Sequence, residues 1–143
     1  MSAKSLQKTL EQQRAQQAWM CVQEVTSKPL DFKKKYGSLA RKVPMLVLTN
    51  GLGQTLAFLL AKAKRREPEQ KRSVEAKAHD LLFVHLSNWV LSQVASSTTA
   101  SNGDLLQWVL QNDSAAYRRA TMEALAFLTW LERFAEAELP TED

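Results

Sequence analysis

Apolar side chains recur every three to four positions along most of this 143-residue sequence. This spacing is typical of helices that bury one face. It predicts amphipathic helices over 4–27, 32–50, 51–64, 73–94, 104–111 and 115–139. The pattern of the last helix is the clearest, and Pro140 ends it because proline cannot continue the helical hydrogen bonds. The sequence therefore predicts a single all-α domain over 1–143, a bundle of about six helices.

The stretch 36–66 holds the densest apolar runs of the chain. Pro44 interrupts the helical pattern there, which predicts a helix that is kinked or restarted near this residue. A strand over 43–49 is the alternative, since this short run contains β-branched residues, but we find no partner strand elsewhere. Asn50-Gly51 predicts a left-handed C-cap, so we expect a tight corner between two helices at 50–53.

The segments outside the predicted helical cores are polar. Residues 62–72 are crowded with charges around a proline and predict an exposed basic loop. Residues 95–103 predict a polar loop, and 139–143 form an acidic tail. The apolar pattern is weak before Ala15, so we expect the N-terminal turns over 1–14 to fray.

Charge is unevenly distributed along the chain. Residues 28–77 carry thirteen Lys and Arg against four acidic residues, whereas residues 78–143 carry three Arg against nine acidic residues. The net charge of +4 conceals this difference. Such asymmetry predicts either a polyanionic partner or head-to-tail contact with another subunit.

The composition fits a globular helical protein, with 45% apolar residues, four glycines and four prolines. The single cysteine, Cys21, cannot form an intramolecular disulfide, which favours a reducing, cytoplasmic setting. We expect the Cys21 side chain to be a small buried apolar group. No apolar run approaches the roughly 20 residues that a membrane-spanning helix needs.

Candidate catalytic and metal-binding residues are few. His79 and His85 lie six positions apart, whereas two metal ligands on one helix face favour a spacing of four. His85 falls on an apolar stripe, which predicts a core histidine. Gly51-Leu52-Gly53 lacks the third glycine of a dinucleotide fingerprint. We therefore expect no enzyme activity from this chain alone, and no cofactor and no metal site.

The basic residues of 28–77 are the strongest functional signal, because Lys and Arg clusters bind phosphates with little regard to sequence. The alternative is that they only keep the surface soluble. Without interleaved aromatic residues or a helix-turn-helix spacing, they favour contact with a nucleic-acid backbone over base reading. The candidates for RNA binding are Lys33, Lys34, Lys35, Arg41, Lys42, Lys62, Lys64, Arg65, Arg66, Lys71 and Arg72.

Two stretches resemble a known family, the small subunit of the Cmr effector complex of type III-B CRISPR systems. The first is Leu39-Ala40-Arg41-Lys42-Val43-Pro44 followed by Asn50-Gly51-Leu52, Gln54, Leu56, Ala57 and Phe58. The second is Tyr117-Arg118-Arg119-Ala120, then Glu123-Ala124-Leu125, Leu128, Trp130-Leu131 and Phe134-Ala135. With the first predicted helix, the resemblance covers nearly the whole chain.

The resemblance implies an all-α subunit without catalytic residues, repeated within a helical ribonucleoprotein. Such a subunit packs against copies of itself and against the large and backbone subunits. It lines the groove where the guide RNA, or crRNA, pairs with target RNA, in antiviral defence. In such complexes RNA cleavage belongs to the backbone subunit. A helix-bundle adaptor that binds a basic protein surface through its acidic end, and never touches RNA, remains the alternative.

Overall fold

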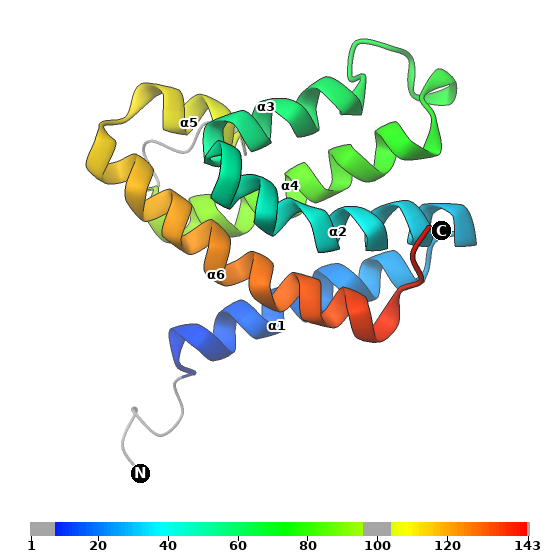
Figure 1. Ribbon diagram of the computed structural model, residues 1–143, viewed down its shortest axis with the longest axis horizontal. Helices are drawn as coiled ribbons and strands as arrows, with labels where there is room; N and C mark the ends of the chain where they lie inside the picture. Colours follow the sequence, from blue (N-terminus) through cyan, green and yellow to red (C-terminus); the bar gives the residue numbers. More distant parts are fainter. Residues whose placement is uncertain (1–7, 96–103, 143) are drawn as a thin grey trace.

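The computed structural model describes residues 8–95 and 104–142, and this part of the chain consists of helices joined by turns and short irregular segments, with no strand (Figure 1). The all-α prediction is therefore confirmed, and the strand alternative for 43–49 is wrong. The predicted turns over 1–7, the polar residues 96–103 and Asp143 lie outside the described residues. The elements are α1 (Leu10–Thr26), α2 (Leu30–Asn50), α3 (Leu52–Ala63), a 3₁₀ helix η2 (Glu69–Lys71), α4 (Val74–Val94), α5 (Leu105–Gln111) and α6 (Ser114–Glu138).

The helices share one hydrophobic core. Helix α6 packs against α1, α2 and α4, while α3 lies on α4 and α5 closes one end of the bundle (Figure 1). Tyr36, Phe83 and Phe127 are the largest fully buried side chains, and they come from α2, α4 and α6. The core therefore forms where the longest helices meet.

Side-chain caps fix where several helices begin. Thr9 accepts a hydrogen bond from the Gln12 amide and the Gln12 side chain accepts one from the Thr9 amide, so α1 starts at Leu10 instead of near residue 4. Ser73 caps α4 by accepting from the amide of Ala76, and Asp113 caps α6 by accepting from the amide of Ala116. These caps satisfy amide groups that have no partner within the helix.

The corner between α2 and α3 consists of Gly51 alone. Helix α2 continues through Pro44 to Asn50, and the Gly51 amide donates to the carbonyl of Val47 at 2.9 Å. Gly51 adopts φ 90° and ψ 159°, which is not the predicted left-handed helical conformation but an extended one that essentially only glycine adopts. The hydroxyl of Tyr117 accepts from the amide of Gly53 at 2.7 Å, so α6 holds this corner.

A buried ion pair joins α1 to α6 and α4. Arg14 donates through Nε and Nη2 to the two carboxylate oxygens of Glu123, at 2.7 and 2.9 Å. Trp89 Nε1 donates to the same carboxylate at 2.8 Å. Burial alone would raise the pKa of Glu123, but the hydrogen bonds from Arg14 and Trp89 hold this pKa below its ordinary value. Residues 10–14 are thereby tied to the bundle.

A second buried network centres on His85 of α4. The Nδ1 atom of His85 lies 2.7 Å from the hydroxyl of Tyr36, and Nε2 lies 2.9 Å from Oε1 of Glu24. The neutral tautomer with a proton on Nε2 satisfies both bonds, since Tyr36 then donates to Nδ1. A second proton on His85 would leave the buried Tyr36 hydroxyl with no acceptor at this site. The predicted core histidine is confirmed, and it links α1, α2 and α4.

This network makes stability depend on pH. Burial lowers the pKa of His85, partly opposed by Glu24, and burial likewise lowers the pKa of His79. Both histidines are neutral in the folded state but gain a proton in the unfolded chain below about pH 6.5, so acid favours unfolding. The contribution of the two neutral histidines to stability is therefore complete above about pH 6.5. It is lost as the pH falls from there through their lowered folded-state pKa values.

We expect the free energy of unfolding to fall between about pH 7.5 and about pH 5.5, with a slope of up to about 1.4 kcal/mol per pH unit for each histidine. Urea titrations across this range measure the slope. His79→Gln removes one of the two titrations, so its slope is smaller than that of the unsubstituted protein. Equal slopes for the two proteins, or stability independent of pH, would contradict this assignment.

Candidate nucleic-acid interface

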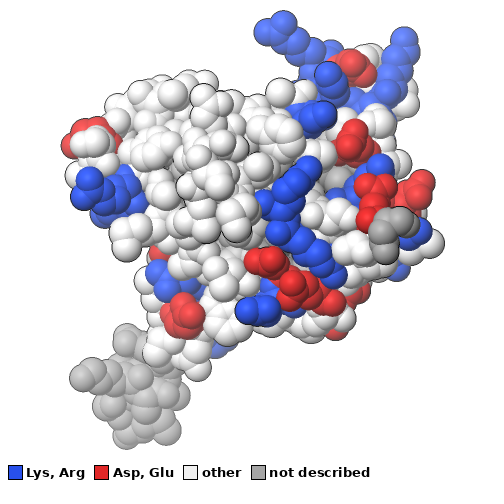
Figure 2. All heavy atoms as spheres, in the orientation of Figure 1, with Lys and Arg blue, Asp and Glu red and all other residues white. Residues whose placement is uncertain are grey.

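The eleven predicted RNA-binding residues lie on two neighbouring parts of the fold. Five belong to α2, and six lie at the end of α3 and in the segment that leads to α4. Figure 2 shows Lys and Arg side chains gathered over these elements, next to a broad area over α3 and α5 without charged side chains. The fold thus gathers the cations on one side, although their partners differ.

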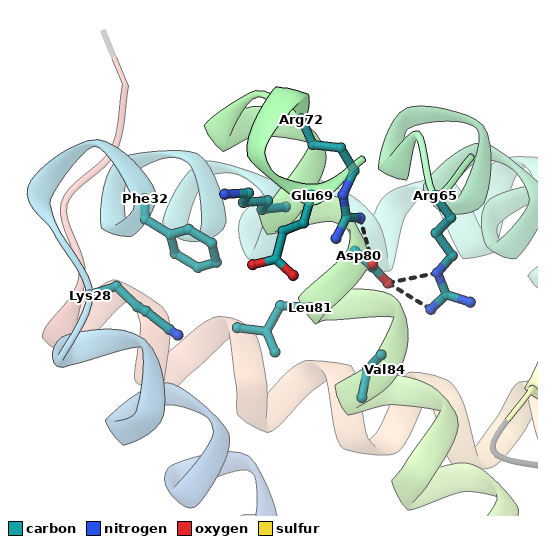
Figure 3. A pocket seen from close by; sticks show the side chains of 9 residues that line it. Lys28, Phe32, Arg65, Glu69, Arg72, Asp80, Leu81 and Val84 are labelled. Atoms are coloured by element: carbon teal, nitrogen blue, oxygen red, sulfur yellow. Dashed lines mark hydrogen bonds and ion pairs between the residues drawn. The ribbon is translucent and has the colours of Figure 1, made fainter. Parts of the chain in front are cut away.

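Asp80 of α4 holds two of the predicted cations (Figure 3). Arg65 donates to its Oδ1 through Nε at 2.9 Å and Nη2 at 2.6 Å, and Arg72 Nη1 donates to Oδ2 at 2.9 Å. Burial alone would raise the pKa of Asp80, but the two guanidinium groups outweigh it and lower this pKa. Arg72 also donates to the carbonyl of Ala63 at 3.1 Å, so it fixes the end of α3.

Two further candidates bind the C-terminal segment. Arg41 donates to the carbonyls of Gly37 and Leu139, at 2.9 and 3.3 Å. Lys35 forms an ion pair of 2.7 Å with Glu142. The chain end therefore returns to the N-terminal half of α2 (Figure 1), and these side chains have internal partners. The predicted acidic tail is in part a docked segment, since Leu139 is buried.

The remaining candidates are available for an external anion. Lys42 lies over the ring of Phe58, with its Nζ 5.6 Å from the ring centre. Lys64 ends α3 in the left-handed conformation and is exposed. Six side chains make no hydrogen bond or ion pair with any residue that the structure describes: Lys33, Lys34, Lys62, Lys64, Arg66 and Lys71.

Two cations outside the predicted set join the same surface. Lys28 precedes α2, and its Nζ lies 5.6 Å from the centre of the Phe32 ring. Lys77 lies on α4 beside Asp80, and together they line an open pocket with Arg65 and Arg72. The sequence could have indicated Lys77, because residues 77, 80 and 81 lie on one face of a helix.

Large apolar side chains are exposed on α2 and α5. Met45 and Leu48 of α2 and Leu110 of α5 are each at least 60% exposed. A depression of about 570 Å³ between α2 and α3 is lined by apolar, hydroxyl and amide side chains and by no charged residue. Contiguous uncharged surface with large apolar groups is typical of protein–protein contact.

The structure places the few side chains that could serve as metal ligands or nucleophiles. No three His, Cys, Asp or Glu side chains among them gather closely enough to hold a metal ion. Cys21 is buried as predicted, and burial raises the pKa of its thiol to about 12, which makes it a poor nucleophile. Within 8–95 and 104–142, each helix is too short or too polar to cross a bilayer.

Comparison with known proteins identifies the family. The family model described as CRISPR-associated protein (Cas_Cmr5) matches residues 10–138. The chain belongs to the Cmr5 family. A curated relative, the CRISPR system Cmr subunit Cmr5 of Thermus thermophilus, is 32% identical over 130 residues, which cover 91% of this chain and 96% of the relative.

A solved structure supports the same family. The crystal structure of a CRISPR-associated Cmr5 family protein, also from Thermus thermophilus, superposes with a TM-score of 0.68 and 27% identity. The match covers 92% of this chain and 99% of that protein. The resemblance stated from sequence is therefore confirmed, and the six-helix arrangement is one that a Cmr5 family protein adopts.

Asp80 offers a direct test of the Cmr5 basic surface. We expect Asp80→Asn to lower the free energy of unfolding by about 1–2 kcal/mol, because Arg72 then loses its charged partner in a half-buried site. We also expect faster proteolysis of 64–72, since both arginines anchor this segment. Chemical denaturation and limited proteolysis with mass spectrometry measure the two effects.

Glu67→Gln provides the matched control for Asp80→Asn. Glu67 is an exposed carboxylate of the same segment whose side chain has no ion-pair partner among the described residues. Its substitution should change stability by less than about 0.5 kcal/mol. The same effect for both variants would contradict the anchoring role of Asp80.

Proposed function

We propose that this chain is a non-catalytic small subunit of a type III-B CRISPR–Cas (Cmr) ribonucleoprotein in the cytoplasm. Its basic side lines the groove that holds crRNA and target RNA, and its uncharged side packs against protein neighbours. Those neighbours are the backbone and large subunits and further copies of this chain. The proposal places it in antiviral defence, as a subunit that shapes the complex while other subunits cut RNA.

The observation that carries this proposal is the family match over 10–138 combined with the division of the surface. Lysines and Arg66, without ion-pair partners among the described residues, lie on α2, at the end of α3 and in the segment after α3. Their ammonium and guanidinium groups suit the phosphates of RNA, and such contacts do not depend on base sequence. The uncharged surface over α3 and α5 leaves a separate side for protein contact (Figure 2).

The alternative is an adaptor that contacts only proteins. The exposed Met45, Leu48 and Leu110 favour it, because their surface fits a protein partner and not RNA. In the adaptor alternative, the unpaired cations only keep the surface soluble. The two proposals therefore differ in what removal of those cations does to RNA binding.

Paired substitutions test the proposal in the assembled complex. We expect Lys33→Gln/Lys34→Gln and Lys64→Gln/Arg66→Gln each to weaken retention of target RNA. Each lost phosphate contact should reduce the salt dependence, the slope of log K against log salt concentration, by about 0.7 to 0.9. Filter binding at several salt concentrations measures both quantities.

Arg118→Gln/Arg119→Gln is the matched control, since it removes two exposed cations from α6, away from this surface. It should leave affinity and slope unchanged. Co-purification of the other subunits with each variant checks that assembly is intact. Unchanged affinity and slope for both test pairs in intact complexes would refute the RNA contact and favour the adaptor.

A further inference from the structure

The basic side contains a pocket of about 630 Å³ where the start of α2, the segment after α3 and the first half of α4 meet (Figure 3). Its volume lies in the range of small-molecule sites. Four cations and two carboxylates line it together with an aromatic ring and two aliphatic side chains. Positive charge and apolar surface therefore meet in one concavity, which scattered surface lysines do not provide.

All four cations have donors to spare, since Arg65 uses only Nε and Nη2. Lys28 and Lys77 make no side-chain hydrogen bond or ion pair with the residues that the structure describes. Arg72 binds Asp80 and Ala63 through Nη1 alone, and its buried Nε has no hydrogen-bond partner among those residues. A phosphate at the mouth of the pocket would meet Lys28 and Lys77 without breaking an existing ion pair.

Asp80 positions two cations of the pocket, and the pocket still has more cations than carboxylates. The two oxygens of Asp80 hold Arg65 and Arg72 through ion pairs, so these guanidinium groups form one side of the pocket. Lys28 and Lys77 also line the pocket, and neither has an ion-pair partner among the described residues. A site with fixed arginines loses less conformational entropy when it binds an anion.

The aromatic ring of the pocket suits a ligand that carries a base, which inorganic phosphate lacks. Phe32 is half-buried and lies along the pocket, with Lys28 above its ring. Bases of single-stranded nucleic acid stack on such rings regardless of their identity. Phosphate-binding cations beside one aromatic ring match the two halves of a nucleotide.

We propose that this pocket binds one nucleotide of a single-stranded RNA segment, with its phosphate on Lys28, Lys77 and Arg72 and its base against Phe32. The inference rests on the proposed function and adds to it a defined site at which the strand is held. It also assigns a role to Lys28 and Lys77, which the charge pattern alone did not single out.

Glu69 is a pocket residue whose negative charge should oppose binding of a phosphate. Its carboxylate points into the pocket between Phe32 and Asp80 (Figure 3), and it has no ion-pair partner among the described residues. A bound phosphate would be repelled by this carboxylate, so Glu69 must turn toward solvent when the nucleotide binds. Removal of its charge should therefore strengthen binding, while removal of Lys77 or Phe32 weakens it.

The test measures binding of a short fluorescent single-stranded RNA to the full chain by anisotropy at low salt. We expect Lys77→Gln to weaken binding by about threefold or more, and Phe32→Leu by about fivefold or more. Glu69→Gln should strengthen binding by at least about twofold. Arg118→Gln, which removes one exposed cation of α6, is the matched control and should change affinity by less than about twofold.

Folding of each variant is checked by thermal denaturation, and Phe32→Leu keeps an apolar side chain so that the bundle is preserved. RNA binding that responds to Lys64→Gln/Arg66→Gln but not to Lys77→Gln, Phe32→Leu or Glu69→Gln would overturn the pocket and leave the proposed function standing. No binding of RNA, either to the chain or through it in the complex, would overturn both.

Adenosine monophosphate serves as the second probe, because a free nucleotide carries the same phosphate and base. We expect it to compete only weakly, since it lacks the neighbouring phosphates that a strand places along the basic side. Competition at an affinity equal to that of the RNA, with the same response to the variants, would assign the pocket to a free nucleotide and overturn the RNA assignment.

Discussion

The burial of α4 inside the bundle is the constraint on which most of this structure depends. A helix that contacts α2, α3, α5 and α6 buries several polar side chains, and hydrogen bonds to its neighbours offset the cost of burying most of them, although the Ser87 hydroxyl has no partner among the described residues. Asp80 binds the segment after α3, His85 binds α1 and α2, and Trp89 binds Glu123 of α6. Successive turns of one helix thus fix the positions of the others.

This constraint also divides the molecular surface. Because Asp80 binds Arg65 and Arg72, these arginines have an internal partner, whereas the lysines around them have none among the described residues. Arg41 and Lys35 are used in a similar way, to hold the C-terminal segment on α2. What remains is a basic side with unpaired cations and an uncharged side over α3 and α5 (Figure 2), which suits a subunit that lies between RNA and protein.

Periodicity predicted the helices well because long amphipathic patterns have one low-energy solution, and the cap at Ser73 and the corner at Gly51 carried clear local signals. The partners of the cations could not be predicted. Arg72 meets Asp80 eight residues away, whereas Arg41 meets the carbonyl of Leu139, 98 residues away. Composition alone gives all cations equal weight, and only packing decides which stay free.

We propose that the basic side of this Cmr5 family subunit touches RNA. Photocrosslinking of the assembled complex to target RNA that contains 4-thiouridine, followed by mass spectrometry of the adducts, tests it most directly. We expect adducts within 28–77, above all near Lys28, Phe32 and Lys77, that disappear with a non-complementary RNA. Adducts elsewhere in this chain, or none in 28–77 while the neighbouring subunits crosslink, would contradict it.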